Sequence, residues 1–524
     1  MWNKVLLQLC ACTCFIVLSN SQSCVNTGPS YAYGSINWQC KNITQTFPSL
    51  NGDVNSINCL ECNIAILDES TITNFRGVTF DLSSSHIRKI AEGAFKTFTN
   101  ITRTFILNNN EIEYMAPKVF SRFSEIDEIS LKGNKISTLY GRVFEGTNLT
   151  KLDLSHNNFA RIDSVFNGLK VTVLNLSSNG IKEIGPSAFG EVIFWKGRYK
   201  FGTQELDLSN NFLNTILLNT FNFPSKDSVI RRLYLQKNLL KVIENDTFLQ
   251  LNFLWYLSLE DNRISQLYKN SFRGLSMLNA LDFANNLLTY IPLGIFADLL
   301  YLTRLDLSQN HLRTFSANTF SGLKSLTKLN ISHNDLQIVD DIHFLPIRRL
   351  AILDISDTKI HDLKLQEIIE DHLSLTTVVL HDNFWVCSKL VQMYKLMNRR
   401  RMGYISPSQY FDVPNLHGVA CSREELSSYD NLTFQDFRII ISQDPIGNPL
   451  DSQDTSDPST NNGIIADVRD ISAMFIVITI IIAALSMQFV VKCVFAYFRN
   501  RKIVTKDKFS FLYTQNHNRV ELLY

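Results

Sequence analysis

The chain has 524 residues, of which 50 are basic and 49 acidic, so its formal net charge is +1. The last segment, residues 492–524, carries seven basic and two acidic side chains, which leaves about −4 for the remainder. The chain as a whole is therefore not strongly basic, and we expect no nucleic-acid partner.

Residues 1–23 are expected to be a secretory signal peptide. Lys4 precedes an apolar run that ends at Leu18, and small residues lie just before Cys24. The run is too short to span a bilayer. The signal predicts an oxidising compartment, which agrees with the use of ten cysteines in the chain.

Residues 24–53 are predicted to begin an N-terminal cysteine cap. The ends of a repeat protein need such caps because the terminal repeats would otherwise expose their core. Four cysteines allow three pairings, and the sequence leaves all three open. They are Cys24, Cys40, Cys59 and Cys62.

Residues 54–386 repeat one pattern, L-x-x-L-x-L-x-x-N-x-L, about 14 times at spacings of 22 to 27 residues, with one spacing of 32. A phenylalanine follows ten residues after most of the asparagines. The asparagine positions are Asn110, Asn134, Asn157, Asn179, Asn211, Asn238, Asn262, Asn286, Asn310, Asn334 and Asn383, with Cys62, Ser85 and Thr358 as substitutes.

Each column of the repeat has a structural interpretation. The alternation around Leu305 and Leu307 predicts a short strand that buries both leucines and exposes Asp306. Stacked strands form a parallel sheet on the inside of a curved solenoid. The amide of Asn310 is expected to bond the backbone of neighbouring turns, and the phenylalanines are expected to pack the convex side.

This region resembles the extracellular leucine-rich repeat family, in the class found in Toll-like receptor ectodomains and leucine-rich adhesion proteins. The resemblance implies an α/β solenoid, a horseshoe with a concave parallel β-sheet, disulfide-bonded caps and one transmembrane helix. It does not define a function, because the same scaffold carries unrelated ligands.

Residues 387–444 are predicted to form the C-terminal cap. The stretch NFWVCSKL resembles the cap signature of the family, N-P-W-x-C-x-C, with Phe384 in place of the proline and Lys389 in place of the second cysteine. The resemblance therefore implies a single disulfide here, between Cys387 and Cys421.

Residues 445–524 predict a single-pass type I protein of the plasma membrane, with its N-terminus extracellular. Residues 445–470 have the composition of an acidic stalk. Residues 471–491 contain no charge and would span roughly 30 Å as a helix. The basic residues that follow indicate a short cytoplasmic tail, 492–524.

Seven N-glycosylation sequons lie on the predicted extracellular side. Two of them, Asn175 and Asn330, occupy the outward position between the two core leucines of a strand, so glycans there would rise from the concave sheet. The seven are Asn42, Asn100, Asn148, Asn175, Asn245, Asn330 and Asn431.

No nucleophile, metalloprotease or phosphate-loop motif occurs, so we expect neither an enzyme nor a cofactor or metal. Aspartates do recur along the sheet, and Asp282 and Asp306 on adjacent strands could couple. The simpler interpretation is that these aspartates belong to the common L-D-L-S motif of the repeat.

The candidate binding residues lie on two neighbouring strands between Asn175 and Asn330. Trp, Tyr and Arg dominate binding hot spots, although a few exposed aromatics also occur by chance. Two alternatives are the loop 194–202 in the long repeat, placed on the convex or lateral side, and the basic run 399–401 in the C-terminal cap. The concave candidates are Arg231, Arg232, Tyr234, Lys237, Trp255 and Tyr256.

Two functions remain after these steps. The first is a receptor or co-receptor that binds a protein or microbial ligand and signals only through partners, because the tail is too short for a signalling domain. The second is a cell-adhesion molecule that mediates cell–cell contact. The sequence leaves both homodimers and heterodimers open.

Overall fold

The computed structural model describes residues 23–29, 36–48, 54–60, 62–186, 188–195, 203–221, 223, 229–405, 413–428 and 431–443. All of them belong to the first of two compact units, residues 1–446. The predicted signal peptide up to residue 22, the stalk, the span 471–491 and the tail 492–524 lie outside the described residues. Within the described ranges, no helix is long and apolar enough to cross a membrane.

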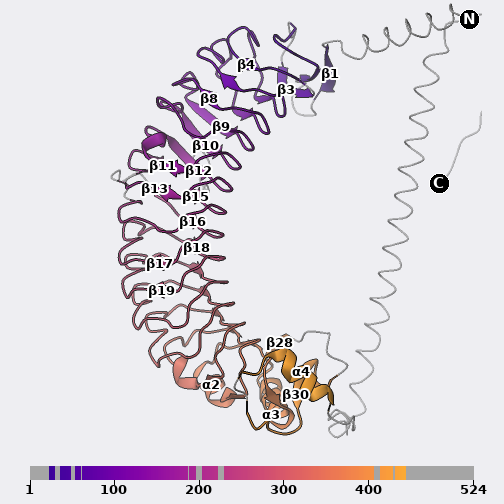
Figure 1. Ribbon diagram of the computed structural model, residues 1–524, viewed down its shortest axis with the longest axis vertical. Helices are drawn as coiled ribbons and strands as arrows, with labels where there is room; N and C mark the ends of the chain where they lie inside the picture. Colours follow the sequence, from indigo (N-terminus) through magenta and orange to yellow (C-terminus); the bar gives the residue numbers. More distant parts are fainter. Residues whose placement is uncertain are drawn as a thin grey trace, which may run out of the picture. The chain divides into compact units, whose positions relative to one another are not determined.

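A parallel sheet runs along the inner side of the first unit, and short strands follow its outer side (Figure 1). The repeat pattern produces this arrangement directly, since Leu305 and Leu307 are buried whereas Asp306 between them is half-buried and faces outward. Equivalent residues pair in register, with Leu281 opposite Leu305 and Leu305 opposite Leu329. The sheet therefore buries one continuous leucine layer.

The main sheet contains 18 strands within the described residues. We call the edge at which its strands begin the leading edge, and the edge at which they end the trailing edge. The strands are β1 (Ser23–Pro29), β2 (Ile36–Lys41), β3 (Val54–Leu60), β5 (Thr79–Asp81), β7 (Thr104–Ile106), β9 (Glu125–Ser130), β10 (Asn148–Asp153), β12 (Lys170–Asn175), β14 (Ile193–Phe194), β15 (Glu205–Asp207), β16 (Arg232–Tyr234), β18 (Tyr256–Ser258), β20 (Ala280–Asp282), β21 (Arg304–Asp306), β22 (Lys328–Asn330), β24 (Ile352–Asp354), β26 (Thr377–Val379) and β28 (Gly403–Ile405).

The asparagine column bonds successive turns together, as the sequence predicts. The amide nitrogen of Asn310 donates to the carbonyls of Phe283 (3.0 Å), Leu307 (3.1 Å) and Ser308 (3.0 Å). Its oxygen accepts the backbone N–H of Leu288 at 3.0 Å. One buried side chain thus bonds four backbone groups of neighbouring turns and supplies the acceptor for the N–H of Leu288.

The phenylalanine column forms a continuous stack beneath the outer side. Ring centroids of Phe272 and Phe296 lie 6.5 Å apart with an interplanar angle of 8°, and Phe296 and Phe320 repeat this at 6.5 Å and 5°. All three rings are buried. Constant repeat length makes this possible, because each ring lies over its equivalent in the next repeat.

The outer side contains short paired strands and few helices. Each outer strand has two residues, so the convex surface is mainly turns. The elements are β4 (Ile66–Leu67), β6 (Lys89–Ile90), β8 (Tyr114–Met115), β11 (Arg161–Ile162), β13 (Glu183–Ile184), β17 (Val242–Ile243), β19 (Gln266–Leu267), β23 (Ile338–Val339) and β25 (Asp362–Leu363), with helices η1 (Ser164–Phe166), η2 (Asp341–His343) and α2 (Leu365–Asp371).

The N-terminal cap is a hairpin that extends the main sheet. Strand β1 is antiparallel to β2, which pairs in parallel with β3. Of the three pairings that the sequence leaves open, the structure has Cys24–Cys40 and Cys59–Cys62. The first predicted repeat unit, with Cys62 at the asparagine position, is therefore part of this cap, and the repeat count is about 13 instead of 14.

The C-terminal cap closes the other end with helices α3 (Cys387–Arg399) and α4 (Phe434–Gln443) and strands β27 (Trp385–Val386), β29 (Asn415–Leu416) and β30 (Val419–Ser422). The Cys387–Cys421 disulfide is present. Phe384, at the usual proline position, packs on Phe437 of α4 at 5.1 Å. Lys389, at the usual second cysteine, lies 3.3 Å from Glu425, so an ion pair joins the two parts of the cap instead.

Candidate functional site

Strands β16 and β18 bring four of the six predicted binding residues together on the concave face. Arg232 pairs across the sheet with Tyr256, and Tyr234 is opposite Ser258. The rings of Tyr234 and Tyr256 lie 5.4 Å apart at 51°. The guanidinium of Arg232 lies 5.8 Å from the ring of Trp255, which is 37% exposed.

Glu205 on β15 orients this group. Its carboxylate lies 2.9 Å from the Arg232 guanidinium, so Arg232 is held between an acidic and an aromatic neighbour. The result is a preorganised surface that combines planar rings with one fixed cation. Such a surface loses little side-chain entropy when a partner binds.

The remaining two residues lie at the two edges of the sheet. Arg231 is beside the cluster on the leading edge, where its carbonyl accepts the N–H of Trp255 at 2.8 Å. Lys237 is on the trailing edge, in a left-handed turn conformation with φ of 58°. Its N–H donates to the carbonyl of Glu260. Lys237 therefore lies beyond the end of β16, on the opposite edge of the sheet from Arg231.

Burial raises the pKa of both tyrosines of the cluster. For Tyr234 the charge of Glu205 adds to this effect, and for Tyr256 the charge of Asp282 does so. Both phenols consequently keep their protons at neutral pH and can donate hydrogen bonds. The cluster offers donors, ring faces and one cation to a ligand.

The aspartate column has a structural role in the turns. Asp306 accepts the backbone N–H of Ser308 at 2.9 Å, and Asp354 does the same for Ser356 at 3.0 Å. Asp282 differs from the others in its pKa, which burial and the charge of neighbouring Asp306 raise to about 6. Among the described residues no group of three or more His, Cys, Asp or Glu side chains could hold a metal ion.

The long repeat adds a short strand to the main sheet at the leading edge, and of the predicted loop 194–202 only Phe194 and Trp195 are described. Strand β14 pairs with the start of β12. The indole of Trp195 donates to the carbonyl of Leu149 at 2.9 Å, and Lys170 lies 5.0 Å from its ring. Residues 196–202 of the predicted loop lie outside the described residues.

The basic run 399–401 ends helix α3 in the C-terminal cap, and all three of its arginines are exposed. Arg401 has a left-handed turn conformation with φ of 54°. The run therefore has the position of a solvated helix end.

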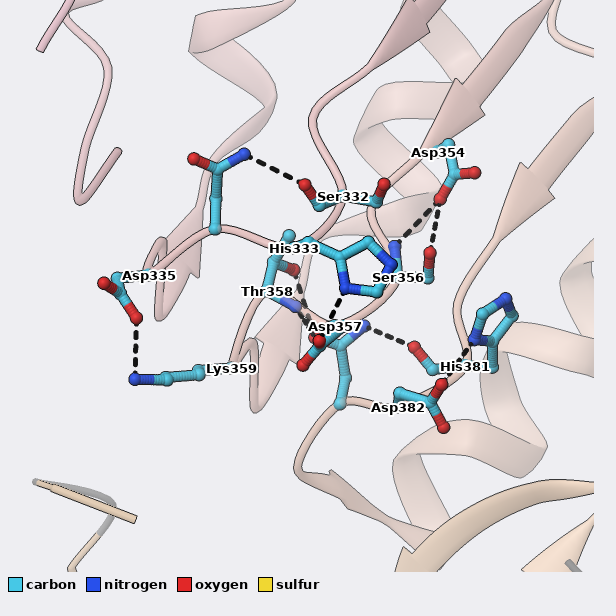
Figure 2. A network of polar contacts seen from close by, with 12 residues as sticks. Ser332, His333, Asp335, Asp354, Ser356, Asp357, Thr358, Lys359, His381 and Asp382 are labelled. Atoms are coloured by element: carbon cyan, nitrogen blue, oxygen red, sulfur yellow. Dashed lines mark hydrogen bonds and ion pairs between the residues drawn. The ribbon is translucent and has the colours of Figure 1, made fainter. Parts of the chain in front are cut away.

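A second polar region lies on the trailing edge of β22, β24 and β26 (Figure 2). Nδ1 of His333 lies 2.7 Å from Asp357, and Nδ1 of His381 lies 2.9 Å from Asp382. Lys359 lies 2.6 Å from Asp335. This network was not predicted from the sequence, although its residues lie within two positions of the asparagine position in consecutive repeats.

Sequence analysis also missed a set of apolar residues on the leading edge. Phe253, Met277 and Tyr301 follow one another at intervals of 24 residues and are exposed at 49%, 45% and 60%. The repeat spacing alone would have identified them as equivalent positions.

The two concave sequons flank the aromatic cluster. Asn175 ends β12 and Asn330 ends β22, with β15, β16, β18, β20 and β21 between them. Both side chains are half-buried. The amide of Asn330 also donates to Asp306 at 3.0 Å, a contact that a glycan on this nitrogen would have to accommodate.

The solenoid, its parallel sheet and its disulfides define a leucine-rich repeat protein. Models of the leucine-rich repeat match residues 102–159, 170–192, 228–288 and 278–336. Parts of the repeat region are similar in sequence to Toll-like receptor 9 and to leucine-rich repeats and immunoglobulin-like domains protein 3. Folds of this kind typically mediate protein interactions, and no enzyme family is indicated.

Individual relatives match only in part. Podocan of Mus musculus is 29% identical over 193 residues, which cover 35% of this chain and 29% of podocan. Toll-like receptor 9 of Equus caballus is 30% identical over 155 residues, which cover 28% of this chain and 14% of the receptor. The chain thus spans well under two thirds of these relatives.

Among solved structures, the APL1 leucine-rich repeat domain aligns with a TM-score of 0.53 at 19% identity, covering 73% of this chain and 97% of that domain. At this level of identity the likeness concerns the fold.

Proposed function

We propose that the chain is a cell-surface receptor or co-receptor that recognises a protein or microbial ligand through its leucine-rich repeats. We infer that residues 471–491 anchor it as a type I protein and that it signals through partners. The observation that carries the proposal is the preorganised cluster on β16 and β18. The exposed Trp255 and the half-buried Arg232, Tyr234 and Tyr256 are of the residue types that dominate protein-binding hot spots.

The position of the cluster supports the same conclusion. Five strands at about 4.8 Å give a window roughly 24 Å wide between the sequons Asn175 and Asn330. A window of this width accepts a loop or helix of a protein ligand. We infer that Arg232, Tyr234 and Trp255, with their neighbours Arg231 and Tyr256, contact the ligand.

A paired alanine substitution tests this assignment. Trp255→Ala is expected to weaken binding by about 2 kcal/mol, and Tyr234→Ala with Trp255→Ala by more. The readout is binding of the tagged protein to cells that carry its ligand, with secretion confirming that the variants fold. Unchanged binding by a normally secreted double variant would refute the concave site and favour the loop 194–202.

Adhesion is the alternative, in which the same cluster would contact a protein on a neighbouring cell. Cells that express the full chain decide between the two functions. Clumping of expressing cells would favour adhesion, whereas dispersed cells that capture a soluble ligand would favour a receptor.

A further inference from the structure

Three large apolar side chains occupy the same repeat position on the leading edge. Phe253, Met277 and Tyr301 each precede a buried leucine of the core, and each is about half exposed. Burying such side chains in a folded chain is the usual outcome, so three exposed in succession require an explanation.

Backbone bonds show that these residues lie on consecutive turns. Along the leading edge, the N–H of Asn279 donates to the carbonyl of Trp255 (2.9 Å), and the N–H of Thr303 donates to the carbonyl of Asn279 (2.8 Å). Phe253, Met277 and Tyr301 each lie two positions before one of these hydrogen-bonded residues. With two further exposed neighbours they form what we call the leading-edge patch: Phe253, Trp255, Met277, Leu300 and Tyr301.

The row of large exposed side chains is limited along the solenoid. In the repeat before Phe253 the equivalent residue is Val229, which is smaller and half-buried, and farther toward the N-terminus it is Lys170 and Glu125. Toward the C-terminus it is Ser325 and Arg349. Asn148, which is a sequon, also occupies this position, so a glycan there would cover the leading edge near β10. None of the seven sequons falls within the patch.

Three cations lie near the patch and form no ion pair with another described residue. Arg231 lies on the leading edge, and Arg304 and Lys328 are the first residues of β21 and β22, in register with Tyr256 of β18. Arg232, by contrast, is paired with Glu205. Carboxylates of a partner would complement these cations.

We propose that the leading-edge patch docks an apolar segment of a partner protein that carries acidic residues at its margins. The proposal rests on the proposed function and specifies where and with what chemistry the partner binds. Trp255 belongs to both surfaces and contacts Arg232, so the patch continues onto the concave cluster. A flat bilayer could not follow this turn into the inner face, which favours a protein over an anionic membrane.

The test is selection of a random displayed-peptide library on the full chain, held by a C-terminal tag. Selected peptides should combine aromatic or aliphatic residues with Asp and Glu. Their affinity should fall roughly tenfold or more in the triple variant Phe253→Ala, Met277→Ala, Tyr301→Ala. Reversal of two cations, Arg304→Glu with Lys328→Glu, should weaken the same peptides.

A matched control replaces three equally exposed apolar residues elsewhere, Tyr140→Ala, Leu218→Ala and Ile338→Ala, which are exposed at 54%, 61% and 56%. This control should bind normally. Because all substituted side chains are on the surface, secretion should be unaffected in both triple variants. A loss of binding in the control as well would overturn the proposal.

Other outcomes separate this proposal from the proposed function. Peptides that ignore the patch variant but require Tyr234 would refute the patch and leave the concave receptor site standing. A selection without peptides that depend on either surface would refute both. Binding of phosphatidylserine vesicles that is lost in the cation variant would replace the protein partner with a membrane.

Discussion

The leading edge around β18, β20 and β21 and the trailing edge of β22, β24 and β26 use their side chains in opposite ways. On the trailing edge, His333 and Lys359 lie within ion-pair distance of Asp357 and Asp335 (Figure 2). On the leading edge, Phe253 and Tyr301 are exposed, and Arg304 has no ionic partner among the described residues.

This difference helps to distinguish side chains that stabilise a repeat protein from side chains that bind a partner. A polar group that is bonded within the chain gains little from a partner, because binding would exchange one contact for another. An exposed ring beside an unpaired cation gains fully from being covered. We therefore assign the trailing-edge network to the stability of the last repeats and the leading edge to binding.

The largest effect on both regions is expected from a charged side chain in the buried leucine layer of the sheet. Leu305 on β21 is 1% exposed, and Leu305→Asp would bury a carboxylate without a partner. We expect a loss of more than about 4 kcal/mol and no secretion. Asp306→Ala, one residue along and facing outward, is the control and should be secreted. Equal yields of the two variants would mean that the register is wrong.

The next largest effect concerns the asparagine ladder that joins successive repeats. Asn310→Ala would leave the N–H of Leu288 without its acceptor. It would also remove one donor from the carbonyls of Phe283 and Leu307, which keep the amides of Asn286 and Asn334. We expect about 2 to 3 kcal/mol of destabilisation, measured by denaturant unfolding. Gln309→Ala, exposed and adjacent, should change stability little. Similar midpoints for the two variants would show that the ladder contributes nothing.

The sequence predicted the features that every repeat must have. Buried residues such as Leu305 and Asn310 recur because each core position meets the same neighbours in the repeats before and after it. The pairing of Cys24 with Cys40 was not predictable, because it depends on how the cap strands meet. Phe253 and Tyr301 were missed because an edge position tolerates any side chain, and its exposure depends on what covers it.

The long repeat illustrates this limit. Its Trp195 covers the leading edge beside Leu149 and Lys170. The repeats that contain Phe253 and Tyr301 have the standard length and lack such an insertion. Spacing shows that an insertion exists, but only the structure shows which edge it covers.

A smaller effect is expected at Asp282, at the boundary between the regions. Its pKa is raised to about 6 by burial and by the charge of Asp306, so between about pH 4 and 6 the folded state holds a proton that the unfolded state does not. Stability is therefore lost as the pH rises through about 6.

Asp282→Asn removes this penalty and should stabilise the protein by about 1 kcal/mol at neutral pH. Asn175 and Asn330 already occupy the equivalent position, and Ala284 prevents a new sequon. Thermal unfolding at pH near 7.5 and near 4 checks the prediction. A gain that is the same at both pH values would contradict the assigned cause.

The smallest effect concerns His333, and it distinguishes the two edges most directly. The hydrogen bond to Asp357 and the charges of Asp357, Asp354 and Asp382 raise the pKa of His333, whereas burial opposes them. A raised histidine pKa adds stability that is complete below the unfolded value of about 6.5 and is lost as the pH rises through the folded value. Because the ring is about half exposed, the contribution should stay well below 1 kcal/mol.

His333→Gln should therefore unfold slightly earlier than the wild type near pH 5.5 and together with it near pH 8.5, as measured by thermal unfolding. The leading-edge variant Phe253→Ala, which removes no charge, should show no such dependence between these pH values. A pH dependence that is identical in both variants would remove the physical ground for assigning the two edges different roles. A difference confined to His333→Gln would show that the trailing edge stabilises through its charges, as its internal contacts require.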